Sequence, residues 1–141
     1  MGRVARSVSV VFGVVSLLMC HGAMLGGLSA NGGARAATLA VFFAGEMFSL
    51  AFVLLLQRPF FPSAGVQAEP PRGRMRRALA ILFGLLQVFP GVSATLIGVL
   101  DGAAATLVVG VAISLTAILF IGGGLRGLLQ SLTAPETLVE G

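Results

Sequence analysis

The sequence predicts an all-α fold, a bundle of four transmembrane helices. Four apolar stretches, at residues 7–28, 38–56, 78–100 and 103–121, are each close to the length that a helix needs. Crossing about 30 Å of hydrocarbon takes about 20 residues. The 141-residue chain is also 57% hydrophobic and only 10% charged, with a mean hydropathy of +1.03. A soluble domain carries about 25% charged residues. We therefore expect a single membrane domain over residues 1–141.

Each stretch is expected to be helical because backbone polar groups inside a bilayer must be satisfied within the segment. A short glycine-rich loop follows the first span, and prolines at residues 59 and 62 end the second. The next loop is the only long one, and it is basic. Pro90 lies within the third span, where it is expected to kink the helix, with a gating hinge as the alternative. A short turn at Asp101 leads to the fourth span, and residues 125–141 are expected to form a C-terminal tail, in which residues 125–130 either continue the helix or lie in the membrane interface.

The basic residues are all arginines, and they gather on one side of the predicted membrane. Arg35 is the only one in the connection between the first two spans. Positively charged loops stay in the cytoplasm, or in the matrix or stroma of an organelle, so both termini and the long loop are expected there. We expect an integral protein of an organelle inner membrane or thylakoid, with a bacterial inner membrane as the alternative. The run before the third span should bind lipid headgroups or an acidic partner protein: Arg72, Arg74, Arg76 and Arg77. Nucleic-acid binding is not expected, because no folded soluble surface accompanies the run.

Small residues recur at four-residue spacing in every span, which is typical of helices that approach closely in a bilayer. Gly22 and Gly26 form such a pair in the first span, and Gly45 and Ser49 form one in the second. The third and fourth spans carry the longer sets Ala94, Gly98 and Gly102, and Thr106, Gly110 and Ser114. Tryptophan and tyrosine, which usually anchor helices at the membrane interfaces, are absent from the sequence. This indicates that neighbouring protein helps to hold the helices.

Three polar residues lie deep within the spans: Glu46, His21 and Gln87. Ionisable groups inside a membrane are costly and usually pair with one another, so His21 and Gln87 are the expected partners of Glu46. A low dielectric favours the neutral form of a carboxyl group. Glu46 is thus expected either to form hydrogen bonds between helices or, in a wet cavity, to couple protons or bind a cation.

Enzymatic catalysis is not expected, because the sequence offers no paired carboxylates, no Ser-His-Asp arrangement and no phosphate-binding loop. No metal site is expected either. We expect no cofactor, with axial ligation of haem or of chlorophyll magnesium by His21 as the alternative. Cys20 is the only cysteine, so an internal disulfide is excluded.

Residues 42–55, with Gly45-Glu46 followed by the run Leu50-Ala51-Phe52, resemble the second helix of the drug/metabolite transporter superfamily, in its solute-carrier-35-like branch. Residues 17–23 and 28–30 are similar to the first helix of that family. The resemblance implies that Glu46 matches the family's glutamate. Such carriers have ten helices in two inverted repeats, so this chain would cover less than one repeat. The family's signatures in its third and fourth helices are absent from residues 87–93 and 107–111.

Two functions fit these observations. The first is a non-catalytic membrane subunit that packs against other transmembrane subunits of a larger complex. The second is a half-sized transporter that works as a homodimer, with Glu46 as the coupling acid. In the transporter Glu46 should line a water-accessible cavity, whereas in the subunit it should be dry.

Overall fold

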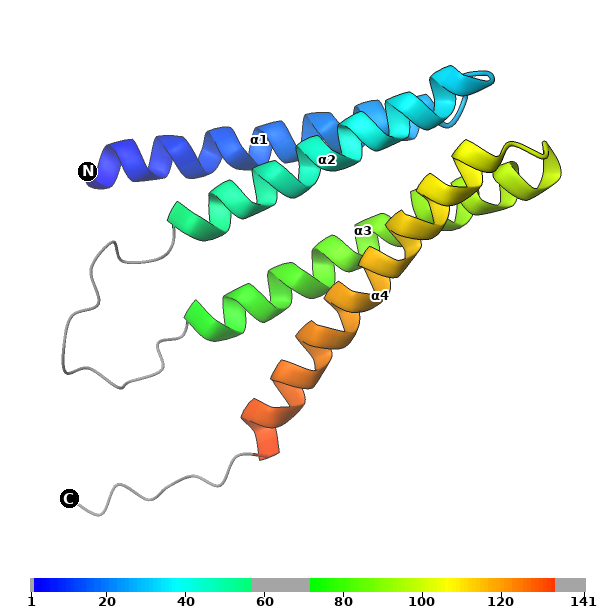
Figure 1. Ribbon diagram of the computed structural model, residues 1–141. Helices are drawn as coiled ribbons and strands as arrows, with labels where there is room; N and C mark the ends of the chain where they lie inside the picture. Colours follow the sequence, from blue (N-terminus) through cyan, green and yellow to red (C-terminus); the bar gives the residue numbers. More distant parts are fainter. Residues whose placement is uncertain (1, 57–71, 134–141) are drawn as a thin grey trace, which may run out of the picture.

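The computed structural model describes residues 2–56 and 72–133, which form four long α-helices (Figure 1). They are α1 (Arg3–Gly27), α2 (Gly33–Leu56), α3 (Arg72–Leu100) and α4 (Ala104–Thr133). Each of them is long and apolar enough to cross a membrane. The prediction of an all-α bundle of four candidate membrane spans is therefore confirmed. Which end of the bundle faces the cytoplasm stays a prediction.

The helices are longer than the apolar stretches that predicted them. α1 begins at Arg3 and α2 at Gly33, each several residues before its predicted span. Within the predicted tail at 125–141, residues 125–133 continue α4, which runs through three consecutive glycines to Thr133, so the first of the two alternatives for residues 125–130 holds. Glycine lowers helix propensity in water, but in a bilayer the backbone must keep its internal hydrogen bonds, so the helix persists. The long predicted loop at residues 57–71 and the end of the chain at 134–141 lie outside the described residues.

Two glycines with left-handed backbone geometry make the turns that join the helices. Gly32 has a φ of 58° and Gly102 a φ of 63°, a region that side-chain-bearing residues rarely adopt. At the end of α3, the Ala103 amide donates to the Gly98 carbonyl and the Gly102 amide to the Val99 carbonyl. This pair of bonds is the Schellman motif, in which glycine ends a helix and satisfies its last carbonyls. Gly102, expected to be a packing residue, is thus a turn residue instead.

The four helices form two antiparallel hairpins, α1–α2 and α3–α4, which touch each other chiefly between α2 and α4. Figure 1 shows both turns at one end of the bundle, and the start of α1 and the end of α4 at the other. The basic residues Arg6, Arg76 and Arg77 belong to this second end, which is here called the arginine end.

Glycines spaced seven residues apart let α3 and α4 approach to backbone contact. Gly84, Gly91 and Gly98 on α3 face Ala117, Ser114 and Leu107 on α4, and a Cβ on any of them would lie within 3.0 Å of α4 backbone atoms. Gly110 on α4 likewise lies against the backbone of Ala94 and Thr95. The expected packing residues of these spans are therefore at the contact or buried beside it: Ala94, Gly98, Thr106, Gly110 and Ser114. A seven-residue repeat is typical of left-handed helix pairs.

α1 and α2 pack in the same way through a different set of residues from the one predicted. Gly13 faces Val53, Cys20 faces Gly45, and Gly27 faces Thr38. Gly22 and Gly26 are exposed and have no atoms of other described helices within 4 Å, so they do not pack inside this bundle, and their packing against helices of other chains stays a prediction. The reason is the rotation of the helix. At 100° per residue Gly22 is turned by about 200° from Cys20, so it lies on the face of α1 opposite to α2.

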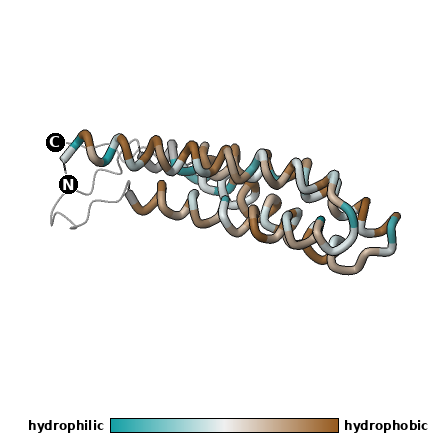
Figure 2. Tube along the Cα trace, turned by 90° about the horizontal axis from the view of Figure 1, so that it is seen from above, coloured by the Kyte–Doolittle hydropathy of each residue, from teal (hydrophilic) through white to brown (hydrophobic). Residues whose placement is uncertain are grey.

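Most of the apolar surface of the bundle faces outward. Figure 2 shows hydrophobic residues along the length of the helices. In the most apolar window of α1 only 11% of the residues are buried, against 22% to 33% in the other helices. The bundle is therefore suited to a surrounding of lipid or of other membrane helices, and α1 is its most exposed element.

Candidate functional site

A polar cluster lies in the middle of the bundle, where the structure brings together the three deep polar residues. Glu46 on α2 contacts His21 on α1, with 2.5 Å between Nδ1 and Oε1. Gln87 on α3 donates from Nε2 to the other carboxyl oxygen of Glu46 at 2.6 Å. Glu46 and Gln87 are fully buried, whereas the side chain of His21 is 13% exposed. One carboxyl group thus joins three helices.

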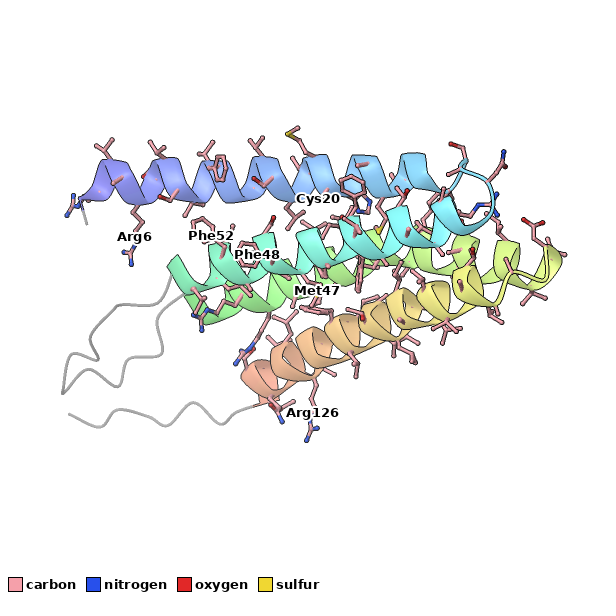
Figure 3. All side chains as sticks on the ribbon, turned by 45° about the horizontal axis from the view of Figure 1, so that its top comes forward. Arg6, Cys20, Met47, Phe48, Phe52 and Arg126 are labelled. Atoms are coloured by element: carbon pink, nitrogen blue, oxygen red, sulfur yellow. The ribbon has the colours of Figure 1, made fainter. Side chains whose placement is uncertain are left out.

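The packing of α1 on α2 positions the first pair of this cluster. A Cβ on Gly45 would lie 2.9 Å from Sγ of Cys20, so the two helices are in close contact one residue away from the pair. Figure 3 shows Cys20 between these two helices. His21 and Glu46 follow directly in sequence and are brought side by side by that contact. Glu46 lies ten residues before Leu56, which is about 15 Å along the helix and hence deep in a bilayer.

One buried polar atom of the cluster has no partner. Oε1 of Gln87 is buried and makes no hydrogen bond in the described part of the chain. Nδ1 of His21 and both carboxyl oxygens of Glu46 are engaged. Chemically, the cluster can share a proton between the imidazole and the carboxyl group, and it can hold three helices together.

Apolar layers lie on both sides of the polar cluster. Toward the turns, one fully buried residue from each helix forms the hydrophobic core: Met24, Leu39, Ala94 and Ile113. Toward the arginine end, a cavity of about 140 Å³ lies between α1, α2 and α3. Its lining is entirely apolar and consists of Val14, Leu17, Leu18, Leu50, Val53, Leu79, Leu82, Phe83 and Leu86. We call it the inter-hairpin groove.

A second cavity, of about 130 Å³, lies between α1 and α2 and is lined by Phe12, Gly13, Ser16, Phe48, Ser49 and Phe52. Figure 3 marks Phe48 and Phe52 on α2. Glu46, His21 and Gln87 line neither of these two cavities. Glu46 is fully buried, and both of its carboxyl oxygens are bonded to protein groups.

An ion pair joins the two hairpins at the turn end. Arg35 Nη1 donates to Asp101 Oδ2 at 2.9 Å, and Arg35 Nε donates to the carbonyl of Leu28. The sequence placed both charged residues on this side of the membrane but did not pair them. The pairing of Arg35 with Asp101 could have been predicted, because they are the only two charged residues in the two predicted connections at the turn end. An exposed pair of this kind contributes at most about 1 kcal/mol.

The remaining predicted residues lie at the arginine end or within α3. Pro90 is buried in an α3 that is helical on both sides of it. The kink and the hinge stay predictions. Arg76 and Arg77 lie in the first turns of α3, and Arg77 packs over Gly127 of α4. Arg72 and Arg74 belong to the same helix, with side chains outside the described set.

In residues 2–56 and 72–133, no three His, Cys, Asp or Glu side chains come together as metal ligands would. In comparisons with known protein families, curated proteins and solved structures, none matches this chain. The function is therefore argued from the geometry of the bundle, and the likeness to drug/metabolite transporters remains a hypothesis.

Proposed function

We propose that this chain is a non-catalytic integral membrane subunit that packs against transmembrane helices of other subunits in a larger complex. The observation that carries the proposal is the outer face of α1. This helix is the least buried of the four, and its exposed residues follow the alternating three- and four-residue spacing of a helix-packing seam. The seam consists of Val8, Phe12, Val15, Met19, Gly22 and Gly26.

The two glycines at the end of this seam, Gly22 and Gly26, favour another protein helix over lipid as its neighbour. Gly22 and Gly26 leave open space on the surface of α1, with nothing within 4 Å of either position. Lipid chains are as apolar as leucine, so small residues on a membrane-facing surface favour the close approach of another helix. The interior glycines of this chain already pack in that way against their neighbours.

The state of Glu46 supports the same proposal. A coupling acid must exchange its proton with water, whereas Glu46 is fully buried and both its oxygens are bonded to side chains of other helices. In the subunit, the cluster ties α1 and α3 to α2 and so keeps the outer face of α1 in a fixed orientation.

Native gel electrophoresis of the untagged protein, gently solubilised from its own membrane, tests the proposal. We expect the 14.3 kDa chain to migrate within a much larger complex. Replacing Gly22 and Gly26 by leucine should lower the fraction of chain in the complex about tenfold or more. Leucine there prevents close approach, and overpacking costs about 1–3 kcal/mol.

Gly122→Leu is the matched control, because Gly122 is equally exposed on α4 and has no atoms of other helices within 4 Å. This variant should assemble as the unaltered chain does. A dimer-sized band from the unaltered chain would contradict the subunit proposal. Equal loss of assembly in the Gly122 variant would contradict the proposal that the outer face of α1 is the surface that binds other subunits.

A half-sized transporter that acts as a homodimer is the second candidate, and the unpartnered Gln87 Oε1 favours it. This atom lies beside Glu46 and would accept a hydrogen bond from water or from a substrate. Proteoliposomes that enclose a pH-sensitive dye test this candidate under an imposed pH gradient. A transporter should carry protons, and Glu46→Gln should abolish that flux. If the chain is a subunit, the unaltered chain and Glu46→Gln should both give the same dye signal as empty liposomes.

A further inference from the structure

The inter-hairpin groove has a floor and a mouth. Its floor is buried, with Phe83, Leu50 and Val53 between 2% and 7% exposed. Its mouth is open, since Leu18 and Leu82 are 58% and 54% exposed although both line the cavity. The groove therefore opens sideways from the bundle, at Leu18 and Leu82.

The length and volume of the groove limit the size of the ligand that it can hold. The lining residues Leu17, Leu50 and Phe83 each lie four residues, or about one helical turn, from His21, Glu46 and Gln87 respectively. The polar cluster thus closes the inner end of the groove. An apolar cavity of about 150 Å³ admits a small hydrocarbon such as benzene, so the groove, at about 140 Å³, holds part of a hydrocarbon chain.

Arginines stand at the other end of the groove. Arg76 lies three residues before Leu79 on α3, which puts both residues on the same face and about 5 Å apart along the axis. Arg6 on α1 lies eight residues, or about 12 Å, before Val14. In Figure 3 the side chain of Arg6 extends from α1 toward the side on which α2 and α3 lie, whereas Arg126 extends away from the other helices.

We propose that the inter-hairpin groove binds one anionic phospholipid, with an acyl chain in the groove and the phosphate at Arg6 and Arg76. The charges match, since a phosphate carries the opposite charge and a guanidinium offers five N–H donors in a planar fork. The length matches as well, because the apolar lining begins about one helical turn after Arg76 and ends at the polar cluster. This inference does not depend on the proposed subunit role.

The experiment uses the full chain, purified in detergent without added lipid. Phosphatidylglycerol and phosphatidylcholine with the same acyl chains are titrated separately, and bound lipid is counted by native mass spectrometry. We expect one phosphatidylglycerol per chain, bound at least tenfold tighter than phosphatidylcholine. Arg6→Gln and Arg76→Gln should each weaken binding of phosphatidylglycerol about fivefold, the equivalent of about 1 kcal/mol per arginine.

Two matched controls separate the groove from the general basicity of the arginine end. Arg126→Gln removes the same charge from the same end on the far side of α4, and it should leave binding unchanged. Leu82→Trp should block the mouth and lower occupancy at least tenfold, whereas Leu85→Trp, on an equally exposed α3 residue outside the groove, should not. Equal binding of the two lipids, or equal effects of a variant and its control, would overturn the proposal.

Discussion

Replacing Gly110 by alanine is expected to destabilise the bundle by about 3 kcal/mol or more. A Cβ at this position would lie well inside 3.0 Å of the backbone of Ala94 and Thr95 on α3. Backbone atoms cannot rotate away as the end of a side chain can, so the two helices must separate. Overpacking of a well-packed core costs about 1–3 kcal/mol, and a backbone contact puts this substitution at the upper end. Unfolding in detergent micelles, followed by circular dichroism during a titration with sodium dodecyl sulfate, measures the change.

The chain provides its own control in the same helix. Gly123 is exposed and has no atoms of other helices within 4 Å, so Gly123→Ala adds the same methyl group without a collision. Alanine has the higher helix propensity, and a change between zero and a gain of about 1 kcal/mol is expected. If Gly110→Ala and Gly123→Ala had the same effect, the close contact of α3 and α4 would be contradicted.

The number and type of the helices could be predicted from the sequence because both follow from length and apolarity. A stretch of about 20 apolar residues has few alternatives to a helix when no water is available. The ends of the helices could not be predicted in this way. At Arg3 and beyond Gly124 the chain leaves the apolar stretch, yet the helix continues, since a change of polarity does not by itself end a helix.

Four-residue spacing of small residues predicts the packing residues only in part. The contacts of α3 and α4 repeat every seven residues, as at Gly84, Gly91 and Gly98, and this period is visible in the sequence. Four-residue pairs such as Gly22 and Gly26 occur by chance or for external partners in a chain with twenty glycines. Spacing alone does not reveal which face of a helix turns inward.

The polar cluster was predicted more completely than the packing. Few polar groups lie deep in the predicted spans, so a buried acid has few candidate partners. An unpaired ionisable group is costly inside a membrane, so these few residues are expected to pair with one another. The unpartnered Oε1 of Gln87 and the groove beside the cluster were not predicted. Both depend on how side chains from separate helices meet, which sequence spacing does not fix.

Replacing Glu46 by leucine is expected to destabilise the junction of α1, α2 and α3 by about 2 kcal/mol. The change removes the partner of His21 Nδ1 and of Gln87 Nε2, so the part-buried imidazole and the buried amide each lose a hydrogen bond. An orphaned buried group costs about 1–3 kcal/mol in water-soluble proteins, and a hydrogen bond within a membrane contributes about 0.6 kcal/mol on average and up to about 1.7. Glu46→Gln keeps an acceptor for Gln87 and should cost less than about 1 kcal/mol.

Cys20 provides the measurement, because it is the single cysteine of the chain and packs against Gly45, next to the cluster. Opening of α1 from α2 exposes its thiol, so the rate of its reaction with a maleimide in micelles reports the population of the open form. A loss of about 2 kcal/mol should raise this rate about 30-fold in Glu46→Leu. The triple variant with leucine at His21, Glu46 and Gln87 has no orphaned polar group and should return most of the way to the original rate, since replacing all partners together is often close to neutral. A triple variant as reactive as Glu46→Leu alone would show that the hydrogen bonds do not hold these helices together.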